Sequence, residues 1–138
     1  MEVSSERPLP RPTEASRPYW EACRNHELWL QRCASCGAYR FPAGFMCPDC
    51  SSLDLAWQRV SGRGKIYTYT VVHRAPHPAL AGEAPYAVAL IELDEGPCLM
   101  SNIVGCPSDD VRIDMAVEVV FRDMTPSVTL PLFRPVVR

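Results

Sequence analysis

The chain has 138 residues, of which 47% are hydrophobic, and its formal net charge is −2. This length accommodates one or two small domains with a modest core, and the composition excludes an intrinsically disordered chain. Basic residues are scattered and lysine occurs only at Lys65, so the sequence does not predict a polyanion-binding surface.

The N-terminal residues are polar and proline-rich, without the apolar centre of a signal peptide. No stretch reaches the roughly 18 apolar residues that a membrane-spanning helix needs. We therefore expect a cytoplasmic protein that does not enter a membrane. Disulfides are rare in a reducing compartment, so the seven cysteines indicate metal ligands and packing residues instead.

Residues 1–17 are predicted to form a flexible arm, because they lack the hydrophobic periodicity of a packed element. A short helix is predicted to begin at Pro18, with Ser16 as its N-cap. A helix of this length is marginal alone, so its apolar face should pack either on the following domain or on another subunit. The residues of that face are Tyr19, Trp20 and Cys23.

Two C-x-x-C pairs separated by ten residues dominate the next segment. Residues 28–33 alternate like a strand, and a short return strand at 38–42 between the two knuckles completes the outline of a zinc ribbon. Four soft sulfur donors suit tetrahedral zinc and leave no position open for water or substrate, which predicts a structural site. The predicted ligands are Cys33, Cys36, Cys47 and Cys50.

Two other interpretations of the four cysteines stay open, namely a rubredoxin-like iron centre and a redox dithiol. Iron would colour the purified protein, whereas zinc would not. Gly37 supplies the backbone freedom that knuckles often use after the first pair, but Ser51 stands at the equivalent place after the second. A ribbon this small cannot build its own core, so the metal should supply most of its folding free energy, about 10 kcal/mol.

Beyond a flexible joint at 61–64 the chain is predicted to be all-β. Five short strands with a helical link before the fourth are typical of an OB-type barrel. The predicted strands are 64–74, 85–94, 98–105, 116–124 and 127–136, and the link is 108–115. The fold class is thus mainly β, with a helix and zinc ribbon over 18–60 and a five-stranded OB-fold barrel over 61–138.

Other candidate residues lack a catalytic pattern. The histidines lie far apart without a serine or aspartate motif around them, and no remaining cysteine stands at a helix N-terminus beside a base. We expect hydrogen-bonded or surface histidines at His26, His73 and His77. Packing thiols are expected at Cys23, Cys98 and Cys106. Aspartates that cap the link helix are expected at Asp109, Asp110 and Asp114, and Pro131 should take an edge or bulge position.

Tyr67 and Tyr69 are predicted to share one face of the first barrel strand with Lys65 and His73. OB-folds stack bases on such stripes, so single-stranded nucleic-acid binding is the alternative function. Packing within the barrel is the simpler explanation, and the mild acidity disfavours phosphate binding.

Several segments together resemble one known family, from about Pro18 to the C-terminus. They are PYWEA, the two knuckles, SGRGKIYTYTVVHR, VALIELDEGP and VTLPLFRP. This order resembles the family catalogued as domain of unknown function 35, whose members join a rubredoxin-like zinc ribbon to an OB-fold domain associated with acyl-CoA.

The resemblance implies a non-catalytic accessory subunit. Family members pair with thiolase-superfamily subunits, including thiolases, hydroxymethylglutaryl-CoA (HMG-CoA) synthases and retro-aldolases, and some pair with MaoC-like hydratases; the partner carries the catalytic residues. The small subunit scaffolds the complex and helps to shape the acyl-CoA site. Arg63, Lys65 and Arg74 are expected to face CoA, because their cations suit phosphate. The proline-rich, apolar loop at 75–85 is expected to contact the partner or the acyl chain.

Overall fold

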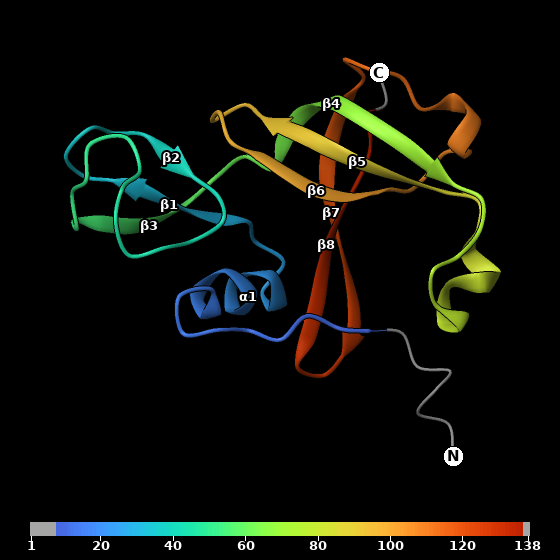
Figure 1. Cartoon of the computed structure of the whole chain (residues 1–138), viewed down its shortest axis with the longest axis horizontal. Helices are drawn as coiled ribbons and strands as arrows, with labels where there is room; N and C mark the ends of the chain where they lie inside the picture. The colour runs from blue at the N-terminus through green and yellow to red at the C-terminus, as the bar shows by residue number, and fades with distance from the viewer. Residues whose placement is uncertain (1–7, 137–138) are drawn as a thin grey trace.

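Two β-structures and one short helix make up the computed structural model, which describes residues 8–136 (Figure 1). The first seven residues of the predicted arm lie outside the described residues. The elements are α1 (Arg17–Arg24), β1 (Trp29–Cys33), β2 (Tyr39–Arg40), β3 (Leu55–Arg59), β4 (Arg63–Val72), η2 (Pro78–Glu83), β5 (Tyr86–Leu93), β6 (Cys98–Ile103), η3 (Ser108–Asp110), β7 (Ala116–Thr125) and β8 (Val128–Pro135). The predicted fold class, mainly β with a helix, a ribbon and a five-stranded barrel, is confirmed.

The ribbon is a three-stranded antiparallel sheet in the order β2-β1-β3. Gln31, in the central strand, lies opposite Arg40 of β2 and Trp57 of β3. The guanidinium carbon of Arg32 stands 4.9 Å from the ring centroid of Tyr39, a cation–π contact between β1 and β2.

The barrel closes in the strand order β4-β5-β6-β8-β7. β4, β5 and β6 form an antiparallel meander, and β7 and β8 form a long hairpin whose tip reaches past the barrel toward α1 (Figure 1). The seam between β6 and β8 is a single parallel bridge, Ile103 opposite Phe133. Pro131 lies beside this sparse seam, where its carbonyl accepts a hydrogen bond from the Ser101 hydroxyl at 2.7 Å.

One continuous core joins the helix, the ribbon and the barrel. Tyr19 and Cys23 of α1 are buried in the same cluster as Phe133, which is completely enclosed. Each fully buried large apolar side chain contributes about 1.5–3 kcal/mol. The ribbon and the barrel are therefore packed as one unit with a shared core, and not as two independent domains joined by a linker.

The joint between ribbon and barrel is held by hydrogen bonds, which corrects the expectation of a flexible segment. The Ser61 N–H donates to the Glu95 carboxylate at 2.9 Å, and the Val119 N–H donates to the Gly62 carbonyl at 2.8 Å. Gly62 has φ +75°, and a Cβ there would overlap Cγ1 of Val119. Only glycine satisfies both the backbone conformation and this close approach.

The start of α1 differs from the prediction. Ser16 makes no capping hydrogen bond to the helix; its hydroxyl instead accepts the Thr13 N–H at 2.8 Å. Ser16 is the N-cap residue of α1, as predicted, but it caps without its side chain, because a local turn competes for its hydroxyl. Burial of Tyr19 and Cys23 stabilises the helix instead, as a short helix requires.

A β-bulge in β4 separates the two tyrosines that were predicted to share a face. Ile66 lies opposite Ile91, but the next pair is Thr68 opposite Leu90, so the extra residue Tyr67 shifts the alternation. Tyr67 is 59% exposed, whereas Tyr69 packs against the core. The predicted aromatic stripe is therefore wrong, and the observation that favoured nucleic-acid binding is lost.

The predicted link helix is reduced to the single 3₁₀ turn η3. No side chain caps it at its start, so the prediction that aspartates cap this link is wrong. Asp109 and Asp110 lie within the turn itself. Asp114 follows it with φ +67°, and its backbone N–H donates to the Ile66 carbonyl at 2.8 Å.

Candidate functional site

Two equivalent turns present the four cysteines of the ribbon. The Gly37 N–H donates to the Cys33 carbonyl at 2.8 Å, and the Ser51 N–H donates to the Cys47 carbonyl at 2.9 Å. Gly37 has φ +79° and Ser51 has φ +64°, so serine adopts the left-handed conformation that glycine adopts in the first turn. The second knuckle therefore forms despite its departure from the glycine pattern.

The four sulfur atoms lie within 4.8 Å of one another. Cys33 Sγ is 3.5 Å from Cys50 Sγ, and Cys36 Sγ is 3.7 Å from Cys47 Sγ, so each short distance joins one knuckle to the other. A tetrahedron with Zn–S bonds of about 2.3 Å has edges of about 3.8 Å. The donor set fits zinc in both chemistry and spacing.

Backbone groups favour the thiolate form at the centre of this site. The Cys36 N–H points at Cys33 Sγ at 3.4 Å, and this hydrogen bond lowers the pKa of Cys33 to about 6. Cys33 and Cys47 are buried, whereas Cys36 and Cys50 are exposed. Four cysteine thiolates complete a tetrahedral shell, so the centre is structural and holds the ribbon together.

The remaining cysteines do not join this centre. Cys23 is fully buried, and burial raises the pKa of its thiol to about 12, which makes it an inert packing residue as expected. Cys106 is half-buried against the core, but Cys98 is exposed, so the prediction that all three are packing thiols is wrong for Cys98.

His26 has a partner that the sequence did not predict. Its Nε2 lies 2.9 Å from Asp123 Oδ1, and its ring stacks on Phe121 with centroids 5.3 Å apart. The hydrogen bond from His26, aided by one from Thr129, lowers the pKa of the Asp123 carboxyl. Residues 97 positions apart carry no local signal of such a contact.

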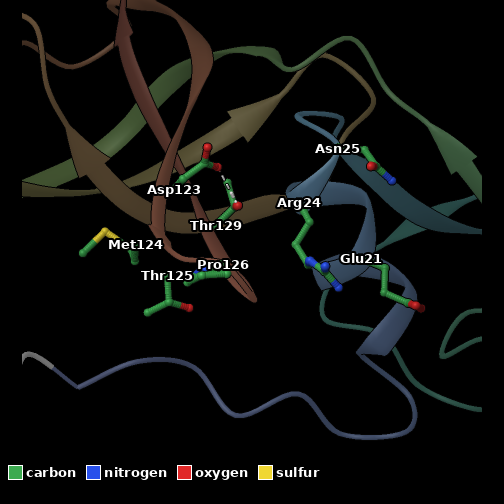
Figure 2. Close-up of a pocket in the computed structure, with 8 residues that line it drawn as sticks. All are labelled: Glu21, Arg24, Asn25, Asp123, Met124, Thr125, Pro126 and Thr129. Atoms are coloured by element: carbon green, nitrogen blue, oxygen red, sulfur yellow. Dashed lines mark hydrogen bonds between the residues drawn. The ribbon is translucent and has the colours of Figure 1, made fainter.

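A polar cleft of about 630 Å³ lies between the end of α1 and the tip of the β7–β8 hairpin (Figure 2). Glu21 and Arg24 line it from the helix, and Asp123 and Thr129 line it from the hairpin. The Thr129 hydroxyl donates to Asp123 at 2.8 Å, so the carboxylate stands between this hydroxyl and the imidazole of His26. Both hydrogen bonds end on the same oxygen of Asp123, so the three side chains link the end of α1 to the hairpin.

The three cations expected to face CoA do not lie together. Arg63 and Lys65 stand at the beginning of β4, and Arg74 follows its far end. The Lys65 ammonium lies 3.7 Å from the Glu92 carboxylate, so its charge is already partly compensated. The other histidines stand apart from them as well: His77 Nδ1 accepts the Ala79 N–H at 3.0 Å, while His73 is exposed.

A closed four-cysteine zinc ribbon packed on an OB-type barrel is the class that this fold and site define. Comparison with known families agrees over most of the chain. Residues 20–56 match the rubredoxin-like zinc ribbon domain of ChsH2, and residues 57–122 match the C-terminal OB-fold domain of ChsH2. The chain belongs to this family, the ChsH2-type DUF35 proteins.

Individual relatives support the assignment. The chain is 42% identical over 131 residues to the "Probable enoyl-CoA hydratase alpha subunit" of Thermomonospora curvata, covering 95% of this chain but 40% of that protein. It is 36% identical over 111 residues to a "DUF35 domain-containing scaffold protein" of Methanothermobacter thermautotrophicus, covering 80% of this chain and 83% of that protein. The chain thus spans less than half of the first relative and most of the second.

One solved structure is similar in both fold and sequence. It is described as "Ltp2-ChsH2(DUF35) aldolase" and aligns with a TM-score of 0.83 and 41% identity, covering 91% of this chain and 98% of that chain. A DUF35 protein of Sulfolobus solfataricus aligns with a TM-score of 0.65 at 16% identity, which supports the fold alone. None of the helices that the structure describes is long and apolar enough to cross a membrane.

Proposed function

We propose that this chain is a non-catalytic, zinc-binding accessory subunit of a thiolase-type acyl-CoA enzyme, of the thiolase, HMG-CoA-synthase-like or retro-aldolase kind. It scaffolds the catalytic subunit and helps to shape the acyl-CoA site. The observation that carries the proposal is the similarity to a chain solved as part of the Ltp2-ChsH2 aldolase. The two chains are 41% identical, and the alignment covers 98% of that chain and 91% of this one. The relative named as a hydratase α subunit is a second link to an enzyme of several subunits.

The division of labour follows from the chemistry of the metal centre. A complete shell of four thiolates offers no coordination position for substrate, so the acyl-CoA chemistry belongs to the partner. In this proposal residues 18–60 form the stapled platform and residues 61–138 form the barrel beside the acyl-CoA site. The protein works in the cytoplasm, where reducing conditions keep the cysteines available for zinc.

Contacts to the ligand are part of the same proposal. Arg63 and Lys65 approach CoA phosphates at one end of β4, and Arg74 approaches at the other. The loop at 75–85, which contains η2, contacts the partner or the acyl chain. The contacts of Arg63 and Lys65 are separate from the contact of Arg74, because β4 lies between them.

Affinity capture from the native host tests the proposal. The tagged chain is purified under zinc-preserving conditions, and the stoichiometric companion is identified by mass spectrometry and assayed with acyl-CoA substrates alone and together with this chain. We expect a thiolase-superfamily subunit whose activity or stability depends on this chain. Recovery of the chain without any acyl-CoA enzyme would contradict the proposal.

A further inference from the structure

The segment between β2 and the second knuckle exposes large apolar side chains. Phe45 is 73% exposed and Met46 is 51% exposed. The Cys47 N–H donates to the Ser52 carbonyl at 2.8 Å, so a backbone hydrogen bond joins the residue after Met46 to the residue before Leu53, which is 76% exposed. Half of the large hydrophobic residues that are exposed in the described chain thus lie at this end of the ribbon, a grouping typical of an interaction surface.

The backbone of the loop at 41–46 is fixed by the side chain of Gln31, which lies beneath it in the ribbon sheet. The Gln31 amide donates from Nε2 to the Gly44 carbonyl at 2.9 Å, and its Oε1 accepts the Gly44 N–H at 2.9 Å. Gln31 is only 7% exposed, and it belongs to the central strand of the ribbon. A buried amide that pairs in both directions with one residue fixes the position of that residue.

Arg40 fixes the two sides of the same loop. Its Nε donates to the Pro42 carbonyl at 3.3 Å, and its Nη1 donates to the Met46 carbonyl. A Cβ at Gly44 would lie 2.6 Å from Arg40 Nη2, so the guanidinium occupies the space that a side chain would need. The exposed side chains are therefore carried on a backbone that is already ordered, and little conformational freedom remains to be lost on binding.

A small apolar pocket lies at the base of the loop. It has a volume of about 160 Å³, and its walls include the aromatic rings of Tyr19, Trp20, Phe41 and Trp57. An apolar cavity of about 150 Å³ is large enough to hold benzene, so this pocket has room for one aromatic or branched side chain. Aromatic pockets beside exposed apolar residues are typical centres of protein–protein interfaces.

The charges around the loop select the kind of occupant. Asp49 lies inside the second knuckle and Asp54 directly follows Leu53. In the part of the chain that the structure describes, neither carboxylate forms a hydrogen bond or ion pair. Acidic groups repel nucleic acid and anionic lipid, and a second copy of this chain carries a formal net charge of −2 and so offers no excess of cations. A partner with basic residues around an apolar recess satisfies both the apolar and the acidic groups.

We infer that residues 41–46 together with Leu53, here called the ribbon loop surface, dock on the catalytic subunit of the enzyme proposed above. Phe45 and Met46 enter an apolar recess of that subunit, and one apolar side chain of the subunit enters the aromatic pocket. Arg or Lys residues of the subunit face Asp49 and Asp54. This inference rests on the proposed function, but it assigns the contact to the ribbon.

The test compares purified, zinc-loaded variants for affinity to the catalytic subunit recovered with the wild-type chain. The double variant F45S/M46S should bind at least tenfold more weakly, and L53S should weaken binding as well. The control Ile113→Ser removes an equally large residue that is 59% exposed on the barrel side, and it should bind within about twofold of wild type. Zinc content and melting temperature are measured for every variant, because these solvent-facing changes should leave the fold intact.

Several outcomes separate this inference from the proposed function. Wild-type chain that captures no acyl-CoA enzyme removes the proposed function itself. Wild-type chain that binds while F45S/M46S binds equally well overturns only the ribbon loop surface. If F45S/M46S turns a dimer of this chain into a monomer and keeps its affinity for the catalytic subunit, the occupant is a second copy and the inference is wrong. Asp49→Lys with Asp54→Lys should slow association at low salt; an unchanged rate contradicts the basic rim.

Discussion

His26 Nε2 lies 2.9 Å from Asp123 Oδ1, and this contact joins the end of α1 to the tip of the β7–β8 hairpin. The hydrogen bond from His26 lowers the pKa of Asp123 below its ordinary value of 3.8. A carboxyl whose pKa is lower in the folded state stabilises the fold above its unfolded pKa. That contribution is lost as the pH falls through the lowered folded pKa.

Replacing Asp123 with Asn should therefore lower the melting temperature near neutral pH. The difference from wild type should begin to shrink as the pH falls below about 4, where the carboxyl of the unfolded wild-type chain becomes protonated, and it should vanish once the pH has passed the lowered folded pKa. Thermal melts of both proteins across the acid range measure this difference, and any loss of zinc affects both proteins alike. A difference that stays constant with pH would show that the carboxylate charge has no role.

Removal of the metal should unfold the ribbon first. Zinc supplies about 10 kcal/mol to a site of this kind, and Cys47 is buried at its centre. Chelation, or the variant Cys47→Ser, should abolish the tertiary signal of Trp57, which lies on β3, and should prevent assembly with the catalytic subunit. Metal analysis should find one zinc per chain without a visible absorption band; a coloured protein would instead indicate iron. An intact complex that turns over poorly would contradict a structural role.

Gly62→Ala should destabilise the protein by about 1–3 kcal/mol, because alanine is strained at φ +75° and its Cβ would overlap Val119. The matched control is Gly82→Ala, where a Cβ meets no atom within 4 Å, and the change should stay within about 0.5 kcal/mol. Urea unfolding of the zinc-loaded variants measures both. Equal stability of the two variants would show that the joint tolerates movement.

The proposed CoA contacts predict a kinetic effect without loss of assembly. In the complete enzyme, R63A/K65A and Arg74→Ala should each raise KM for acyl-CoA roughly tenfold, since each removes a charged partner of a phosphate. The control Arg59→Ala removes an exposed cation of the ribbon that pairs with Glu27 at 3.5 Å. Unchanged KM in R63A/K65A and in Arg74→Ala would leave these residues as ordinary surface charges.

The loop at 75–85 offers a further test of the interface. Replacing residues 76–84 by a short Gly-Ser linker should weaken the complex or its activity, because Leu80 and its apolar neighbours are only half-buried in the isolated chain. Melting temperature and zinc content should change little, since η2 contributes no buried residue to the core. Full complex formation and full activity in this variant would remove the loop from the interface.

Features with a local signal could be predicted from the sequence. The spacing of Cys33 to Cys50 predicted the ribbon, and the run at 85–94 predicted the strand that the structure contains as β5. The bulge at Tyr67 could not be predicted, because the shift is set by the partner strand and not by the residues of β4. The contact of His26 with Asp123 was likewise inaccessible, since the barrel must close before the two residues meet.

The exposed side chains of the loop at 41–46 could not be predicted from the sequence either. The exposure of Phe45 could not be predicted from the sequence of the loop, because an aromatic residue ahead of a knuckle is equally suited to packing. The buried pairing of Gln31 with Gly44 decides the matter, because it holds the loop outward. The signal for an exposed Phe45 therefore lies in the buried polar residue Gln31, a position in the ribbon where hydrophobic periodicity predicts nothing.

The continuity of the core across helix, ribbon and barrel sets an order of events during synthesis. All four zinc ligands lie between Cys33 and Cys50, so the ribbon can capture its metal while the barrel is still being translated. The face of α1 that packs on β8 has to wait, because β8 is translated after every other described strand. Until then the ribbon covers only part of the apolar face of α1, since Tyr19 packs on Phe41 with ring centroids 5.2 Å apart. The nascent chain is then a metal-bound intermediate with a partly exposed apolar helix, the stage at which early contact with a chaperone would matter most.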